Sequence, residues 1–346
     1  MIDKKTVFIL GAGASCPYGY PSGSCLRWLI CFHGGFQNNY FNYLNQSKLD
    51  QRIREQRRGE VNHFIKAFKD SNIKSVDVFM ANNPKLAPIG KYIIAYEIFR
   101  AERNSCFSEE AKRRQEQFED LRKNPDRKRQ LWEIAGFVGG DWYFYLYNRL
   151  LEGLVGKDAL PDFSNDNIAF ITFNYDRSLE QFFYESLSHL NSEVPEDRII
   201  QTLKQLKIIH VYGQIAPLKW QNANDYVEYK SQTDESLLQC AANNVKTIYE
   251  EKENPELMEA QNLIKQSEQM FFLGFGYAPE NMEVLGLPSI IPQRCLVYGT
   301  AFGANDKEVK RIHKRIIDGD TTDSKAARRK VIEPTDCLEL LRNYLE

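Results

Sequence analysis

The chain has 346 residues, of which 42% are hydrophobic and 12% aromatic, and its formal net charge at pH 7 is −2. This length permits two domains, or one α/β domain with a large insertion, and the apolar content supports a sizeable core. The small net charge gives no global attraction to nucleic acid or to an anionic membrane. No apolar stretch reaches the roughly 20 residues that span a bilayer. Direct nucleic-acid binding and membrane association are therefore not expected.

Seven cysteines are scattered along the chain, and none forms a CxxC pair. An odd, scattered set is typical of a reducing compartment and argues against a disulfide framework. A structural zinc site needs closely spaced ligand pairs, so no metal is expected. The N-terminus carries early charge, and its first apolar run, Val7 to Leu10, is too short for a signal peptide. These features predict a cytoplasmic protein.

The first predicted element is a strand over Thr6–Leu10, which runs into the turn Gly11-Ala12-Gly13-Ala14-Ser15. Glycines let backbone N–H groups approach a pyrophosphate, and the next helix N-terminus favours negative charge. The dehydrogenase fingerprint is incomplete, because Cys16 occupies the third glycine position and the acidic ribose ligand expected roughly 20 residues on is absent. The turn predicts nucleotide binding outside the dehydrogenases, with a tight turn that binds no ligand as the alternative.

From about residue 40 to 155 the sequence is polar and helix-rich, with few strand candidates. Residues 101–130 are densely charged, and the mixed signs favour a solvated helical pair over a nucleic-acid surface. After Pro161 strand and helix patterns alternate. Strands are predicted over 167–173, 207–212, 269–273 and 294–298, and helices over 177–190, 234–267, 305–318 and 335–345.

This alternation predicts an α/β fold with a Rossmann-like, mostly parallel sheet and helices on both of its faces. The polar, helix-rich sequence that follows the first strand predicts a large helical insertion there. We therefore expect a Rossmann-like, nucleotide-binding domain formed by residues 1–30 and 156–346, and a helical insertion module formed by residues 31–155.

Phe173-Asn174-Tyr175-Asp176 lies at the carboxyl end of a predicted strand, where ligands bind in open α/β sheets. Asn174 offers donors and an acceptor, whereas Asp176 only accepts, which suits sugar hydroxyls or a helix cap. Capping would fully explain Asp176 but not Asn174, which needs a partner beside a buried strand. His210 ends another strand, beside Gly213, and is expected at the same sheet edge; a hydrogen-bonded core histidine is the alternative.

Five segments, taken in order and separation, carry a family resemblance. They are Gly11-Ala12-Gly13-Ala14-Ser15, Gly19-Tyr20-Pro21-Ser22-Gly23, Ser75-Val76-Asp77-Val78-Phe79, Thr172-Phe173-Asn174-Tyr175-Asp176, and Leu273-Gly274-Phe275-Gly276 with Asn281. Together they resemble the sirtuin family, and more closely its bacterial sirtuin-like branch of antiphage NAD hydrolases. Asp141-Trp142-Tyr143 is similar to a tryptophan motif common in that branch. The resemblance extends from residue 7 to about residue 303.

The resemblance implies NAD as the substrate and a role for each matching residue. Asn174 and Asp176 would hold the nicotinamide ribose region as catalytic residues, with His210 as the base. The glycine turn would hold the diphosphate, and Gly274, Phe275 and Gly276 would line the adenosine ribose. The other residues expected in the NAD site are Gly11, Ala12, Gly13, Ser15, Pro21, Gly23, Asp77, Phe173, Tyr212, Gly213 and Asn281.

Two departures from the sirtuin pattern refine this expectation. The four-cysteine zinc module and the Pro-Asp-Phe-Arg segment of sirtuin deacylases are missing, since the chain has no cysteine pair and reads Pro21-Ser22-Gly23. This favours plain hydrolysis. The family usually has His directly before Gly, but here Tyr212 occupies that place. Side chains two apart on a strand share a face, so His210 is expected to reach the site, with Tyr212 as the fallback.

The expected function is therefore that of an NAD glycohydrolase, which releases nicotinamide and ADP-ribose and depletes NAD in bacterial antiphage defence by abortive infection. A module that senses NAD or ADP-ribose, and an NAD-dependent protein deacylase, are the alternatives. A toxic NAD hydrolase must be restrained until it is needed. The resemblance accordingly implies a homo-oligomer or a regulatory partner, such as a HerA-type ATPase.

Overall fold

A computed structural model describes residues 2–32, 35–47, 49–105, 140–154, 156, 160–165, 167–190, 193–247, 255–317 and 330–345. The charged segment 101–130, predicted as a helical pair, lies mostly outside these ranges. Within them, no helix is both long and apolar enough to cross a membrane.

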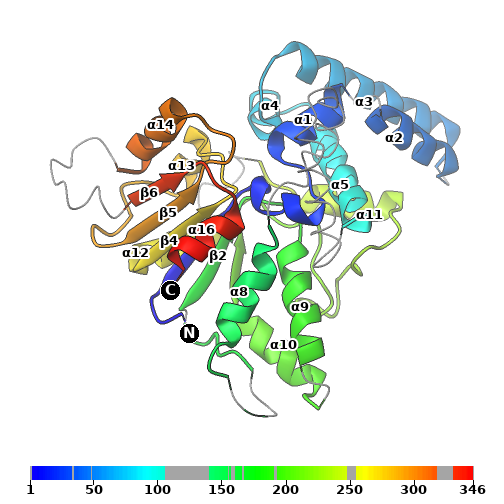
Figure 1. The fold of residues 1–346 in the computed structure, drawn as a ribbon. Helices are drawn as coiled ribbons and strands as arrows, with labels where there is room; N and C mark the ends of the chain where they lie inside the picture. Colours follow the sequence, from blue (N-terminus) through cyan, green and yellow to red (C-terminus); the bar gives the residue numbers. More distant parts are fainter. Residues whose placement is uncertain are drawn as a thin grey trace, which may run out of the picture.

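Six strands form one parallel sheet in the order β3-β2-β1-β4-β5-β6 (Figure 1). Their bounds are Thr6–Leu10 (β1), Ile168–Thr172 (β2), Lys207–His210 (β3), Gln269–Leu273 (β4), Leu296–Thr300 (β5) and Lys330–Glu333 (β6). The chain runs outward from β1 to β3, then returns to place β4 on the other side of β1. The carboxyl ends of β1 and β4 therefore meet at a topological switch point, where open α/β sheets bind ligands.

The central strands are buried along their whole length and mostly apolar, because both faces of the sheet are covered. One face carries a row of rings from neighbouring strands. Phe8 stacks on Phe170 of β2 and on Phe271 of β4, with centroids 5.1 and 5.4 Å apart. Phe271 in turn stacks on Tyr298 of β5, and Tyr298 on Tyr344, at 5.2 and 4.4 Å. This aromatic row fixes the side-by-side register of the strands.

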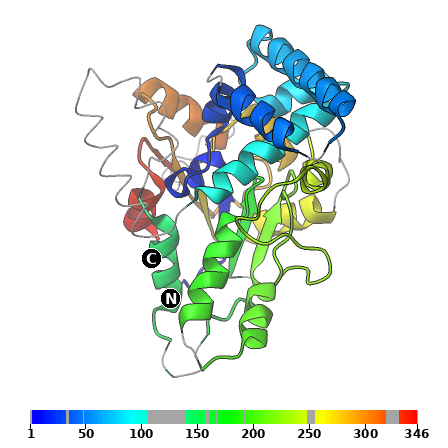
Figure 2. The same cartoon turned by 90° about the vertical axis from the view of Figure 1, so that its right-hand side faces the viewer.

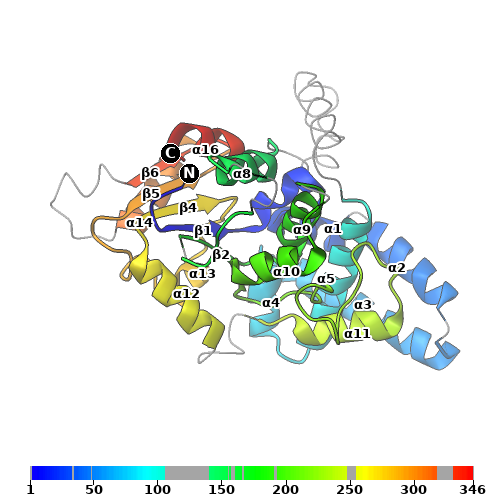
Figure 3. The same ribbon diagram turned by 90° about the horizontal axis from the view of Figure 1, so that it is seen from below.

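Helices cover both faces of the sheet, as predicted (Figure 3). Three helices lie on the face of the aromatic row: α8 (Trp142–Leu151), α9 (Ser178–Leu190) and α16 (Cys337–Tyr344). The opposite face carries α12 (Pro255–Gln266) and α14 (Asp306–Ile317). The remaining short helices are α10 (Glu196–Gln205) and α13 (Pro279–Val284).

A large helical insertion separates β1 from β2, as predicted. Its helices before α8 are α1 (Gly23–Cys31), α2 (Gly35–Gln46), α3 (Gln51–Asp70), α4 (Val76–Asn82) and α5 (Ala87–Arg103). Together with α11 (Glu235–Asn244), from the connection after β3, they lie beyond the carboxyl edge of the sheet (Figures 1 and 2). Helix α8 falls within the predicted module, yet it covers the sheet.

Two local expectations were wrong, and one strand was missed. The glycine turn does not lead into an α-helix but into two 3-10 turns, Ala12–Ala14 and Cys16–Tyr18, the second of which contains a proline. The predicted helix over 234–267 ends at Asn244, because Val245 is extended, and a second helix begins at Pro255. Strand β6 was not predicted.

Candidate functional site

The loops after β1 and β4 cross in direct backbone contact at the switch point. Gly11 and Gly13 donate their amide hydrogens to the carbonyls of Leu273 and Gly274, at 3.0 and 3.1 Å. A Cβ on Gly11 would lie 2.6 Å from the Gly274 oxygen, and Gly274 itself has a φ of +57°. Glycine is required here because the two backbones approach too closely for any side chain.

This crossing changes the interpretation of the glycine turn. The amides of Gly11 and Gly13, expected to hold a diphosphate, are engaged with strand β4 and its loop. Their glycines are explained by close packing, which was the alternative considered for the turn. The turn instead presents its carbonyl and serine oxygens to the loop after β2.

Asn174 lies between these loops and is 7% exposed. Its Nδ2 donates to the Gly11 carbonyl at 3.1 Å and to Ser15 Oγ at 3.0 Å. Because a carbonyl only accepts, these bonds fix which end of the amide faces the turn. The Oδ1 atom is buried and has no hydrogen-bond partner within the described ranges. Such a group costs about 1–3 kcal/mol, and a donor from outside the described chain would satisfy it.

Asp176 is buried on the other side of Ser15. Its Oδ1 accepts from the amide, at 3.1 Å, and from the hydroxyl of Ser178, the first residue of α9. Asp176 thus accepts from the first residue of the helix, which begins one residue later than predicted. Burial raises the pKa of Asp176, although hydrogen bonds from Ser178 and Ser15 counteract this. Ser15 thus connects Asn174 to Asp176.

His210 reaches the same edge, as predicted, because it pairs with Thr172 in the sheet. Its Nδ1 lies 2.9 Å from the Asn174 carbonyl and its Nε2 lies 2.5 Å from Glu180 Oε1. The carbonyl can only accept, so Nδ1 donates to it, and with Glu180 as a carboxylate Nε2 donates as well. Burial lowers the pKa of His210, but the Glu180 charge and hydrogen bond outweigh it, and the pKa rises above its ordinary value.

This geometry bears on the expected role of His210 as a base. A ring that donates from both nitrogens has no lone pair left to take a proton from water. In the observed arrangement the imidazole holds the backbone of Asn174 against helix α9. Glu180, which is 1% exposed, was not singled out from the sequence.

Tyr212 and Asn281, two residues expected in the NAD site, meet directly. The Tyr212 hydroxyl donates to Asn281 Oδ1 at 2.7 Å. Phe173 lies between Tyr212 and Phe275, with ring centroids 5.3 Å from each. Gly213 adopts a φ of +77°, which accommodates the turn that directs Tyr212 inward. Phe173, Tyr212 and Phe275 therefore form an aromatic cluster that joins the segments after β2, β3 and β4.

Asp77 joins the insertion to the Asn-Tyr-Asp segment through Tyr175. Its Oδ1 accepts from the Tyr175 hydroxyl, which also donates to the Lys246 carbonyl at 3.3 Å. Burial raises the pKa of Asp77, partly offset by the hydrogen bonds from Tyr175 and Ser75. Asp77 is thus brought beside the segment, where it fixes Tyr175.

Three further expected residues lie apart from this cluster. Pro21 is half-buried, and Gly23 is exposed as the first residue of α1. Gly276 is exposed, and a Cβ there would meet open space. The structure brings none of these three into hydrogen-bond contact with Asn174 or Asp176.

The Asp141-Trp142-Tyr143 motif, to which the sequence assigned no role, supports both functional loops. Trp142 Nε1 donates to the Ala14 carbonyl at 2.8 Å, behind the glycine turn. The Tyr143 hydroxyl shares a hydrogen bond of 2.8 Å with Ser178. Asp141 accepts from Tyr18 at 3.1 Å and caps α8. The motif is therefore explained by contacts to the loops after β1 and β2.

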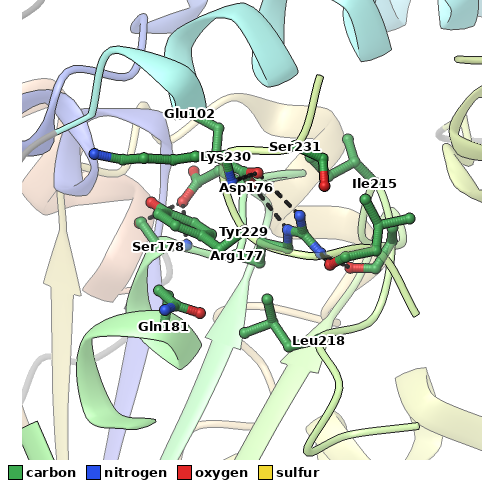
Figure 4. A network of polar contacts seen from close by, with 12 residues as sticks. Glu102, Asp176, Arg177, Ser178, Gln181, Ile215, Leu218, Tyr229, Lys230 and Ser231 are labelled. Carbon is green, nitrogen blue, oxygen red and sulfur yellow. Dashed lines mark hydrogen bonds and ion pairs between the residues drawn. The ribbon is translucent and has the colours of Figure 1, made fainter. Parts of the chain in front are cut away.

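A fully buried ion pair, missed from the sequence, anchors the insertion beside the site (Figure 4). Arg177 follows Asp176, and its guanidinium forms two hydrogen bonds of 2.9 Å with Glu102 of α5. Neither side chain is accessible to solvent. Arg177 also donates to the carbonyls of Pro217 and Glu228. There was no clear signal in the sequence, because Arg177 stands between two polar residues, where an exposed arginine would be ordinary.

Across the described part of the chain, no three His, Cys, Asp or Glu side chains gather as a metal site. Comparison of the chain with models of known protein families finds no match, and comparison with curated proteins finds none either. The function is therefore inferred from the site itself, a buried amide acceptor held between the loops at the switch point of a parallel sheet.

Proposed function

We propose that this protein is an NAD glycohydrolase that cleaves the nicotinamide–ribose bond at Asn174. Water and NAD⁺ would give nicotinamide, ADP-ribose and a proton. The observation that carries the proposal is the buried, unpartnered Oδ1 of Asn174 at the carboxyl edge of the sheet.

The topology supports a dinucleotide substrate. The strand order 3-2-1-4-5-6 is the order of sheets that bind dinucleotides across the crevice at their switch point. The loops after β1, β2 and β4, which carry Gly11, Asn174 and Gly274, converge there. Since Gly11 and Gly13 use their amides internally, the diphosphate would be held by other groups at this edge.

The chemistry of NAD cleavage suits an acceptor at this place. Nicotinamide leaves a cationic precursor as a neutral base, so its departure needs no general acid. Positive charge grows on the ribose, and an enzyme must be complementary to that state. Asn174 Oδ1 is a fixed dipole of the required sign, and the carboxylate of Asp176, when ionised, adds negative charge nearby.

We assign His210 a positioning role in this reaction, in place of the expected general base. Its two hydrogen bonds hold the Asn174 backbone, and through it the direction of Oδ1. To accept a proton from water, the ring would first have to give up the proton shared with Glu180. Tyr212, the fallback, donates its hydroxyl hydrogen to Asn281 and is no better placed to act as a base.

Nicotinamide release from NAD by the purified protein tests the proposal. Loss of one fixed electrostatic group costs roughly 100-fold or more in rate, so Asn174→Ala should reduce release by at least that factor while the protein stays folded. Asn262→Ala, at an exposed position of α12, is the matched control and should retain full activity. Full activity in Asn174→Ala would contradict the assignment. NAD binding without release would favour a sensing module, and release only with an acylated peptide would favour a deacylase.

We further propose that the activity is restrained by self-assembly or by a HerA-type ATPase, in the setting of antiphage defence. This part rests on the family resemblance alone. Size-exclusion chromatography with light scattering, with and without such a partner, would test it. A monomer in both experiments would contradict it.

A further inference from the structure

A cavity of about 610 Å³ lies between helix α9 and the loop that follows β3. Gln181 and Tyr184 line it from α9, and Leu218, Trp220, Tyr229 and Lys230 line it from the loop. Figure 4 shows Gln181, Leu218, Tyr229 and Lys230 around the Arg177–Glu102 pair. None of the residues that line this cavity belongs to the proposed NAD site.

The walls of this cavity are fixed by partly buried hydrogen bonds. Arg177 donates to the carbonyls of Pro217 and Glu228, 3.2 and 2.9 Å away, on the two arms of the loop. The Lys230 amide donates to Glu102 Oε1 at 2.9 Å, and the Leu218 amide donates to a side-chain oxygen of Gln221 at 2.7 Å. A preformed cavity spares a ligand the cost of ordering the loop on binding.

Trp220, one of the residues that line the cavity, carries a polar atom without a partner among the described residues. This side chain is 8% exposed, and its Nε1 is buried with no acceptor in the described ranges. An indole can only donate, and an unpaired buried donor is rare in folded proteins. Trp142, by contrast, donates its Nε1 to the Ala14 carbonyl. A ligand that brings an acceptor to Trp220 would satisfy this group.

The other lining groups indicate which ligand would fit. Two ammonium groups, of exposed Lys219 and of Lys230, border the cavity, and Lys230 uses one of its three hydrogens for the Ser105 carbonyl. Ammonium groups bind phosphate as point charges. Glu185 and Glu228 offer carboxylate oxygens, which accept from sugar hydroxyls. Tyr184 and Trp220 offer aromatic surface for a flat ring.

We propose that this cavity binds a nucleoside monophosphate, separately from the NAD site. The base would lie against the aromatic side chains, with a ring nitrogen or carbonyl accepting from Trp220 Nε1. The phosphate would lie near Lys219 and Lys230, and the ribose hydroxyls near the carboxylates. The volume falls within the roughly 300–1,000 Å³ of small-molecule sites, which exceeds what phosphate or a free amino acid would fill.

Calorimetric titration of the full chain with AMP tests the proposal at physiological ionic strength. Trp220→Phe keeps an aromatic ring but removes the donor, and Lys219→Glu reverses a charge at an exposed position where folding is not at risk. Each should weaken binding by about ten-fold or more. Trp28→Phe and Lys204→Glu, a tryptophan and an exposed lysine outside the lining, should leave the affinity unchanged.

Asn174→Ala separates the two sites. AMP binding that persists in Asn174→Ala and falls in Lys219→Glu supports the second site, whether or not the protein hydrolyses NAD. AMP binding lost in Asn174→Ala and unchanged in Trp220→Phe and Lys219→Glu would overturn the proposal, because the nucleotide would then occupy the switch point. Absence of AMP binding, or equal binding of inorganic phosphate, would overturn the assigned ligand class.

Discussion

The side-chain amide of Asn174 is oriented by a carbonyl that can only accept. Asn174→Asp would place a carboxylate oxygen 3.1 Å from the Gly11 carbonyl, where the Nδ2 donor lies now. The variant would lose two hydrogen bonds and bury a repulsive contact. We expect it to lower the free energy of unfolding by about 2 kcal/mol, and by more than Asn174→Ala does. Urea unfolding measures both. Asn262→Asp is the surface control, and equal stability of Asn174→Asp and wild type would contradict the assigned amide orientation.

The His210–Glu180 pair predicts a pH-dependent contribution to stability. Because the pKa of His210 is raised in the folded protein, the folded state holds this proton more tightly than the unfolded chain. The stabilisation is complete below the unfolded value of about 6.5. It is lost as the pH rises through the higher folded value. Glu180 and Asp176 are the charged groups that favour the proton.

His210→Gln should remove this dependence. The difference in unfolding free energy between wild type and His210→Gln, measured in urea between about pH 6 and pH 9, should shrink as the pH rises. A difference that grows with pH would mean that His210 is neutral in the folded state, which would restore it as a candidate base.

Gly274 and Gly276 differ in whether a side chain could be accommodated at their positions. Gly274 has a φ of +57°, and a Cβ there would lie 2.0 Å from the Ala14 nitrogen, whereas a Cβ on Gly276 would meet nothing. Gly274→Ala combines backbone strain with a backbone clash, so it should destabilise the fold by about 2 kcal/mol or more. Gly276→Ala should be nearly neutral. Thermal unfolding of the two variants checks this, and equal melting temperatures would contradict the close crossing of the loops.

At the scale of elements, the Arg177–Glu102 pair is a fully buried link between the insertion and the loop after β2. Removing one partner leaves an uncompensated charge in a site closed to solvent. Arg177→Met or Glu102→Leu alone should therefore cost about 3–5 kcal/mol, and the double variant should cost less than the sum. Urea unfolding of the wild type, the two single variants and the double variant measures the coupling energy between Arg177 and Glu102. The exposed pair Lys207–Glu259 is the control, because Lys207→Met should change stability by roughly 0–1 kcal/mol. Additive losses at Arg177 and Glu102 would contradict the coupling.

The strands and the site residues differ in how well they could be predicted from the sequence. The parallel sheet was predictable, because mostly apolar strands alternate with helices. Strand β6 was missed because Lys330–Glu333 is short and begins and ends with charged residues. Asn174 and His210 could be assigned to one edge because both end strands. Their actual partners, Ser15 and Glu180, depend on how the turn and α9 fold back, which local patterns do not encode.

At the scale of the whole molecule, the predicted boundary between sheet domain and insertion is crossed by buried contacts. Asp77 bonds to Tyr175, Glu102 pairs with Arg177, and Trp142 donates to the Ala14 carbonyl. Each contact joins a residue within 31–155 to one outside it, next to the proposed catalytic segment. Domains that unfold separately need boundaries that few contacts cross. The insertion and the sheet are therefore expected to depend on each other for stability.

This dependence predicts one cooperative unfolding transition in urea. Far-UV circular dichroism follows all helices, and tryptophan fluorescence includes Trp142, at the junction of α8 and the glycine turn. The two probes should give coincident curves, which is the test of a two-state transition. In Arg177→Met, where one link is broken, the curves should separate, since the insertion would then loosen before the sheet. Two transitions in the wild type would instead mean that residues 31–155 fold as a unit of their own. In that case the conformation of the loop that carries Asn174 would depend on the sheet and not on the insertion.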